Sequence, residues 1–142
     1  MPTAEQIQKM MQPLFPGLMG VEIKEATQDK IVATMLVRPD LCTAGGVCHG
    51  GAFMAFADYC LFAIAAPVLQ GPAVTVSFGC EFLDAAREGE LVEGSGEIMR
   101  AGGSMIFMRG VLKSGERPLF TFSGTIKRVK WRAPPAASND AG

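Results

Sequence analysis

The most unusual residue of this 142-residue chain is an aspartate inside an apolar segment. Asp58 is the only charged residue between positions 50 and 69, a segment whose composition predicts a helix. The residues three and four positions away, which share its helix face, are all apolar: Met54, Ala55, Leu61 and Phe62. Burying an unpaired carboxylate is costly, and the helix itself offers no Lys or Arg. Asp58 therefore either pairs with a cation from elsewhere in the chain or faces a cleft as a catalytic group.

A second candidate site lies where this helix begins, at the sequence His49-Gly50-Gly51. The first amides of a helix have no acceptor within the helix and carry the positive end of its dipole. Because glycine lets a ligand approach closely, these amides could polarise a carbonyl and stabilise the oxyanion that forms when it is attacked. The alternative is a turn whose glycines serve only positive φ or tight packing.

Several other kinds of site lack support. His49 is the only histidine, and no G-x-S-x-G, G-x-x-x-x-G-K-[ST] or G-x-G-x-x-G motif occurs, which argues against a Ser–His–Asp hydrolase and against nucleotide cofactors. The four cysteines, at positions 42, 48, 60 and 80, form no C-x-x-C pair, so we expect no metal and no cofactor. Thirteen Lys plus Arg against fourteen Asp plus Glu leave no basic field, so nucleic acid is not an expected partner.

The rest of the chain predicts the elements that position these residues. Thr3 followed by Gln6 fits the capping box of a short amphipathic helix that ends at Pro13 and Pro16. Runs rich in β-formers predict strands over residues 21–23, 30–38, 73–82, 91–100, 104–113 and 119–129. The last three have short connections and should be antiparallel neighbours. We expect an α+β fold in which a five- or six-stranded, mainly antiparallel sheet wraps around one central apolar helix.

One domain accounts for residues 1–132, and the small, polar, proline-containing residues 133–142 predict a disordered tail. Residues 50–69 are long enough to cross a membrane, but the paired glycines, Pro67 and Asp58 favour a core helix, so no membrane is expected as a partner. Residues 1–15 lack the apolar run of a secretory signal. With its cysteines reduced, the protein is expected to be cytoplasmic.

The segment GGVCHGGAFMAFAD, residues 45–58, resembles the H-G-G…D signature of the hotdog-fold acyl-CoA thioesterases, in particular the phenylacetate-pathway type. Similar matches follow in TVSF (75–78), FLDAAREGE (82–90) and RAGG (100–103), so the resemblance covers about residues 15–130. It implies a single hotdog domain that hydrolyses an acyl-CoA thioester to the free acid and CoA. An aryl and a medium-chain acyl group suit the Phe and Met content about equally.

The resemblance also implies roles for individual residues. In that family the amide of the first glycine after the histidine, here Gly50, polarises the thioester carbonyl, and the helix carboxylate, here Asp58, acts as general base or nucleophile. A hydroxyl on the third strand, here Thr75, assists the carboxylate. An asparagine six residues before the histidine often orients the attacking water, but this chain has Thr43 there. A hydroxyl lacks the paired donor and acceptor of an amide, so this chain departs from the pattern at that step.

His49 is expected to orient the turn or to contact the ligand. Five residues of the matching segments are expected to bind the substrate: Gly51, Arg87, Arg100, Gly102 and Gly103. The phosphates of CoA need cations, and each candidate could equally be an ordinary solvated charge. These candidates are Arg87, Arg100, Lys127 and Arg128.

Helix geometry adds a constraint on the assembly. Eight residues separate Gly50 from Asp58, about 12 Å at 1.5 Å per residue, which is too far for both to act on one carbonyl. Two chains with antiparallel central helices would bring each Asp58 close to the other chain's Gly50, giving two equivalent sites in a C2 dimer. The resemblance implies the same homodimer, often doubled into a dimer of dimers.

Two other functions stay open. A hotdog hydratase or dehydratase would need His49 and an acidic group to cooperate on a β-hydroxyacyl chain. A non-catalytic acyl-CoA-binding or sensing module would explain Thr43 as a mark of lost activity. Release of free CoA from a panel of acyl-CoAs, measured beside direct binding, separates these functions from hydrolysis.

Overall fold

The computed structural model describes residues 2–130 of the chain. Its first element is the predicted helix, α1 (Ala4–Met11), whose capping box joins Thr3 and Gln6 through reciprocal hydrogen bonds. A second, short helix, α2 (Phe15–Leu18), follows. Pro16 lies in its first turn, where a missing N–H does no harm, so Pro16 begins this helix rather than ending the first one. The tail predicted for residues 133–142 lies outside the described residues.

Within residues 2–130 the sheet has six strands, all paired antiparallel, in the order β1-β2-β4-β5-β6-β3. Their bounds are β1 Val21–Ala26, β2 Ile31–Leu36, β3 Ala73–Phe82, β4 Leu91–Ala101, β5 Met105–Ser114 and β6 Arg117–Arg128. The predicted antiparallel neighbours β4, β5 and β6 form a meander. β3 pairs with β6 and lies at the edge of the sheet. The predicted α+β class, with a sheet around one long helix, is confirmed.

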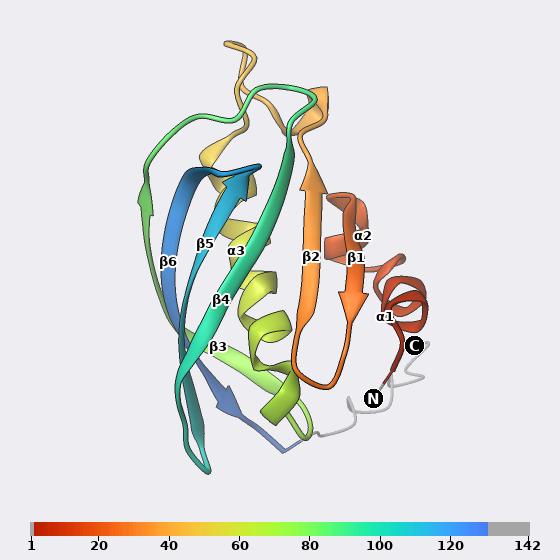
Figure 1. Cartoon of the computed structure of the whole chain (residues 1–142), viewed down its shortest axis with the longest axis vertical. Coiled ribbons are helices and arrows are strands. Elements are labelled where there is room, and N and C mark those ends of the chain that lie inside the picture. The colour runs from red at the N-terminus through yellow and green to blue at the C-terminus, as the bar shows by residue number, and fades with distance from the viewer. Residues whose placement is uncertain (1, 131–142) are drawn as a thin grey trace, which may run out of the picture.

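The central helix, α3 (Gly50–Ala65), packs along one face of the sheet and continues as a 3-10 turn, η2 (Ala66–Val68) (Figure 1). By length and composition alone the segment Gly50–Val68 could cross a membrane. Its large side chains Phe53, Phe56 and Leu61 are instead buried against the sheet, as the prediction of a core helix requires.

Glycines in the sheet let α3 approach closely. A Cβ atom at Gly124 of β6 would overlap the Leu61 side chain, and one at Gly94 of β4 would overlap the Cys60 sulfur. These positions therefore need glycine for close packing rather than for an unusual backbone conformation.

Candidate active site

His49 caps the N-terminus of α3. Its Nδ1 accepts a hydrogen bond of 3.0 Å from the Gly51 amide, and its backbone oxygen accepts one of 2.9 Å from Ala52. Because Nδ1 is an acceptor, the neutral imidazole carries its proton on Nε2. The role of orienting the turn, predicted for His49, agrees with this geometry.

The Gly50 amide is the free donor at this helix end. Within residues 2–130 its N–H has no hydrogen-bond acceptor. The Phe82 ring lies against Gly50, and a Cβ atom on Gly50 would lie 2.9 Å from Phe82 Cε1. Phe82 itself is 56% exposed and packs edge-on against Phe120. An aromatic surface therefore borders a free helix-terminal amide.

Asp58 lies in the middle of α3 and is partly buried. The Thr75 hydroxyl on β3 donates a hydrogen bond of 2.7 Å to its Oδ1. Among residues 2–130, no Lys or Arg forms an ion pair with Asp58. The described part of one chain therefore does not contain the structural ion pair that the sequence left open as an alternative. The structure thus brings together the carboxylate of Asp58 and the hydroxyl that the family resemblance implied for Thr75.

Thr43 lies in the loop that leads to the helix. Its amide donates to the Val47 oxygen (2.8 Å), and its own backbone oxygen accepts from Gly46 (3.0 Å), which has a φ of 79°. The Thr43 side chain is exposed. His49 is tied back to the start of the same loop, because its amide donates to the Leu41 oxygen at 2.8 Å.

Arg87 lies in the connection between β3 and β4, residues 83–90, which touches the Thr43 loop. Val47 and Arg87 form an isolated β-bridge, and the Cys48 amide donates to the Ala86 oxygen at 2.7 Å. Figure 1 shows both loops at the end of the molecule where α3 begins. Arg87 is therefore on the side of the Gly50 amide.

Arg117, at the start of β6, anchors this connection and was not predicted. Its guanidinium donates to Asp84 Oδ2 (2.8 Å), to the Ala85 oxygen (2.7 Å) and to Glu90. The Arg117 hydrogen bond holds the pKa of Asp84 below its ordinary value. The pKa of Glu90 is also held below its ordinary value, mainly by the hydrogen bond from the Arg87 amide (2.6 Å) and next by the one from Arg117. Sequence reasoning missed this role, because nothing in the residues around Arg117 indicates that its partners lie about thirty residues earlier.

The other predicted substrate contacts lie at the opposite end of α3. Arg100 lies near the end of β4, and Gly102 and Gly103 form the turn to β5, where the two glycines line a surface cavity of about 810 Å³ together with residues of η2. Arg128 also lines this cavity, but its guanidinium already donates to the backbone oxygens of Val68 (2.9 Å) and Gly102 (3.4 Å). One chain therefore does not bring this turn to the Gly50 amide.

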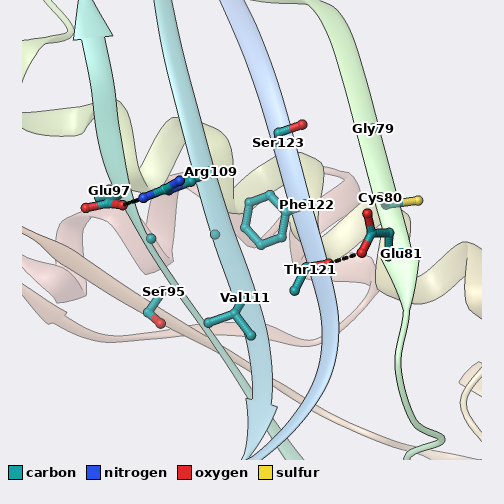
Figure 2. A pocket seen from close by; sticks show the side chains of 12 residues that line it. Gly79, Cys80, Glu81, Ser95, Glu97, Arg109, Val111, Thr121, Phe122 and Ser123 are labelled. Atoms are coloured by element: carbon teal, nitrogen blue, oxygen red, sulfur yellow. Dashed lines mark hydrogen bonds and ion pairs between the residues drawn. The ribbon is translucent and has the colours of Figure 1, made fainter.

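A different cavity, of about 860 Å³, lies over strands β3 to β6 (Figure 2). Its charged groups are already hydrogen-bonded, with Arg109 donating to Glu97 (2.7 Å) and Thr121 to Glu81 (3.4 Å). None of its lining residues is a predicted site residue. Across the part of the chain that the structure describes, no three His, Cys, Asp or Glu side chains are grouped as metal ligands would be.

The chain is similar to known proteins over most of its length. The sequence pattern of the thioesterase superfamily matches residues 45–121, which contain the H-G-G turn, Asp58 and Thr75. A protein of Pseudomonas aeruginosa described as "Putative esterase" is 31% identical over 116 residues, covering 80% of this chain and 87% of that protein.

Two solved structures share the fold. A thioesterase from Haemophilus influenzae superposes with a TM-score of 0.81 and 21% identity, covering 89% of this chain and 90% of that one. A "hypothetical thioesterase protein" from Streptococcus pneumoniae, solved with coenzyme A, has a TM-score of 0.70 and 20% identity, covering 80% and 88% of the two chains. These two likenesses show that the chain shares its overall fold with both proteins.

Proposed function

The chain belongs to the thioesterase superfamily, and on that premise we propose that it hydrolyses acyl-CoA thioesters, with Asp58 and Gly50 as the central groups of the site. The single observation that carries this proposal is the Asp58–Thr75 hydrogen bond of 2.7 Å on a helix whose first amide is free. The helix thus carries two groups that acyl transfer can use: a carboxylate oriented by a hydrogen bond, and a free amide that can stabilise an oxyanion.

The Gly50 N–H polarises the thioester carbonyl. When the carbonyl carbon is attacked, its oxygen becomes an oxyanion, which the free amide and the helix dipole stabilise. The hydrogen bond from Gly51 to His49 supports this role, because it holds the turn while leaving the Gly50 donor unused. His49 therefore acts as a positioning residue for the oxyanion donor.

Asp58 acts as general base toward water or as the nucleophile that forms an acyl-enzyme anhydride. The Thr75 hydroxyl occupies one position on Oδ1 and so restrains the rotation of the carboxylate. The second oxygen, Oδ2, is left for the water or the carbonyl carbon. Thr43 is proposed to contact the attacking water from the loop before the helix.

The complete site takes Gly50 from one chain and Asp58 from a second in a C2 homodimer. The exposed edge of β3 supports this assembly, since Val74 and Val76 are each about half exposed there. On α3, the stripe through Met54 and Asp58 is only partly covered, with Met54 41% exposed and Asp58 partly buried. Antiparallel packing of two such stripes would cover both.

The same dimer would join the two ends of the substrate site. With the helices antiparallel, the end of β4 and the β4–β5 turn of one chain lie on the side of the partner's helix start. These parts hold Arg100, Gly102 and Gly103. Arg87, Arg100 and Lys127 are then the cations proposed for the CoA phosphates, because Arg128 is held by backbone oxygens. The aromatic surface at Phe82 would receive an aryl or medium-chain acyl group. We expect the enzyme to act in the cytoplasm and to form a dimer of dimers.

Steady-state release of free CoA tests the proposal. An aryl-CoA, a medium-chain acyl-CoA and a β-hydroxyacyl-CoA are offered to the wild type and to Asp58→Ala and Asp58→Asn, and binding of each ester is measured by calorimetry. We expect both variants to fold and bind while losing about 10²-fold or more in kcat/KM. Activity above about a tenth of wild type would remove Asp58 from the mechanism. Binding without CoA release in the wild type would identify a sensing module, and loss of water from the β-hydroxyacyl ester a dehydratase.

A further inference from the structure

Two of the four cysteines face each other across the neck of the loop that carries Thr43. Cys42 and Cys48 form an isolated antiparallel β-bridge, and both are free thiols. The Thr43 amide donates to the Val47 oxygen and the His49 amide to the Leu41 oxygen, each at 2.8 Å. These bonds flank the cysteines on both sides, which makes them a non-hydrogen-bonded pair.

This type of pair has a geometry that a disulfide can use. Opposite residues in it have Cα atoms about 4.5 Å apart, with both side chains on the same face. That separation lies at the short end of the range of about 4.4–6.8 Å that disulfides span. Cys42 has extended backbone dihedrals, φ −101° and ψ 155°, as the bridge requires.

The present contacts of the two thiols are weak. Cys42 donates to the Arg38 oxygen at 3.3 Å, and Cys48 donates to the His49 oxygen at 3.7 Å. A thiol is a poor donor, so rotating each side chain toward the other loses little. Cys60 is fully buried beside Gly94, and no bridge pairs it with another cysteine of the described chain.

We propose that Cys42 and Cys48 form a reversible disulfide when the protein meets hydrogen peroxide, closing the loop 43–47 at its neck. Cys42 is half-buried and reacts first. Its thiolate attacks one peroxide oxygen, the O–O bond breaks, hydroxide leaves, and Cys42 becomes a sulfenic acid. The Cys48 sulfur then attacks the Cys42 sulfur, the S–O bond breaks, and water leaves with the Cys48 proton. The two thiols are oxidised by two electrons in total and the peroxide is reduced to water.

The order of these steps agrees with the burial of the two groups. Burial raises the pKa of the Cys48 thiol to about 11, so this sulfur is a poor first nucleophile and serves as the resolving thiol. The loop that would be closed holds Thr43, which the proposed function assigns to the attacking water. Formation of the disulfide needs no substrate, so its test stands or falls separately from thioester hydrolysis.

The test uses the full chain, oxidised with hydrogen peroxide, quenched with catalase and denatured. Free thiols are blocked with iodoacetamide, the protein is reduced with dithiothreitol, and new thiols are labelled with N-ethylmaleimide. Mass spectrometry with fragmentation then assigns each label. We expect the second label on Cys42 and Cys48 only, in a chain that runs as a monomer on a non-reducing gel. Before oxidation, no cysteine should carry the second label.

Cys42→Ser and Cys80→Ser are matched variants, since both remove a half-buried cysteine. Oxidised Cys80→Ser should label as the wild type does, and Cys42→Ser should carry no second label on Cys48. The proposal is overturned if the wild type gains no second label or gains it on Cys60 or Cys80. A covalent dimer, or loss of thiols that dithiothreitol does not reverse, overturns it as well. The wild-type assay decides the matter even if Cys42→Ser fails to fold.

Discussion

The Gly50 amide offers a direct test of oxyanion stabilisation at the start of α3. Proline removes the N–H, and the first residue of a helix is the position where proline is best tolerated. The residue before a proline must be extended, and His49 already has φ −63° and ψ 137°. Loss of one oxyanion donor lowers kcat by about 10²- to 10³-fold. We expect a loss of that size in Gly50→Pro, measured as release of free CoA.

Gly50→Ala is the matched control. Both substitutions add a Cβ atom, which would lie 2.9 Å from the Phe82 ring, but alanine keeps the N–H. Circular dichroism and Tm verify that both variants are folded. If Gly50→Ala loses as much activity as Gly50→Pro, crowding against Phe82 explains the loss, and the oxyanion role of the amide is refuted.

Mixing subunits extends the same test to the assembly. Gly50→Pro and Asp58→Asn homodimers are each expected to be inactive, and random remixing makes about half of the dimers mixed. If each site takes Gly50 from one chain and Asp58 from the other, a mixed dimer has one intact site, and about a quarter of wild-type activity returns. If both residues acted within one chain, every site would keep one defect. The two-chain site is refuted if no activity returns although mass spectrometry has confirmed that the subunits exchanged.

Two further predictions concern the hydrogen bond to the carboxylate and the packing beneath it. Thr75→Val removes the donor to Asp58, a bond to a charged group worth about 1.5–3 kcal/mol, so we expect kcat/KM to fall about 10-fold or more, with Thr75→Ser close to wild type. Equal losses in both would contradict this role. Gly124→Ala places a Cβ into Leu61 and should lower the free energy of unfolding by about 1–3 kcal/mol, measured by urea denaturation. Gly71→Ala, at a position with open space, is its control.

Local signals in the sequence predicted most elements closely. The strand expected over residues 73–82 is β3 (Ala73–Phe82), and the capping box at Thr3 forms with Gln6. Both patterns depend on neighbours within a few residues, which the sequence contains in full. The short turns between β4, β5 and β6 likewise leave only antiparallel pairing open.

Long-range pairing was harder to predict, because it depends on residues far apart in the sequence. The connection over residues 83–90 is long enough to cross the molecule, so nothing local indicates that β3 pairs with β6 rather than with β4. Arg117 reaches back to Asp84 and Glu90, and each of these charges alone fits an ordinary solvated surface. The Asp58–Thr75 contact was expected because the resemblance supplied Thr75. Helix periodicity alone indicated only that Asp58 needed a partner.

The contacts that close the core also determine where the carboxylate lies. Cys60 packs at Gly94 on β4 and Leu61 at Gly124 on β6, so two consecutive helix residues fix both the depth and the rotation of α3 on the sheet. Asp58 precedes Leu61 by three residues, close to one turn, and reaches β3 just beyond β6, where Thr75 donates to it. A hydrogen bond of 2.7 Å is lost if its atoms separate by about 1 Å, and larger side chains at the two glycines would push α3 away from the sheet. Glycine at these sheet positions is therefore a requirement of the proposed site as well as of the fold.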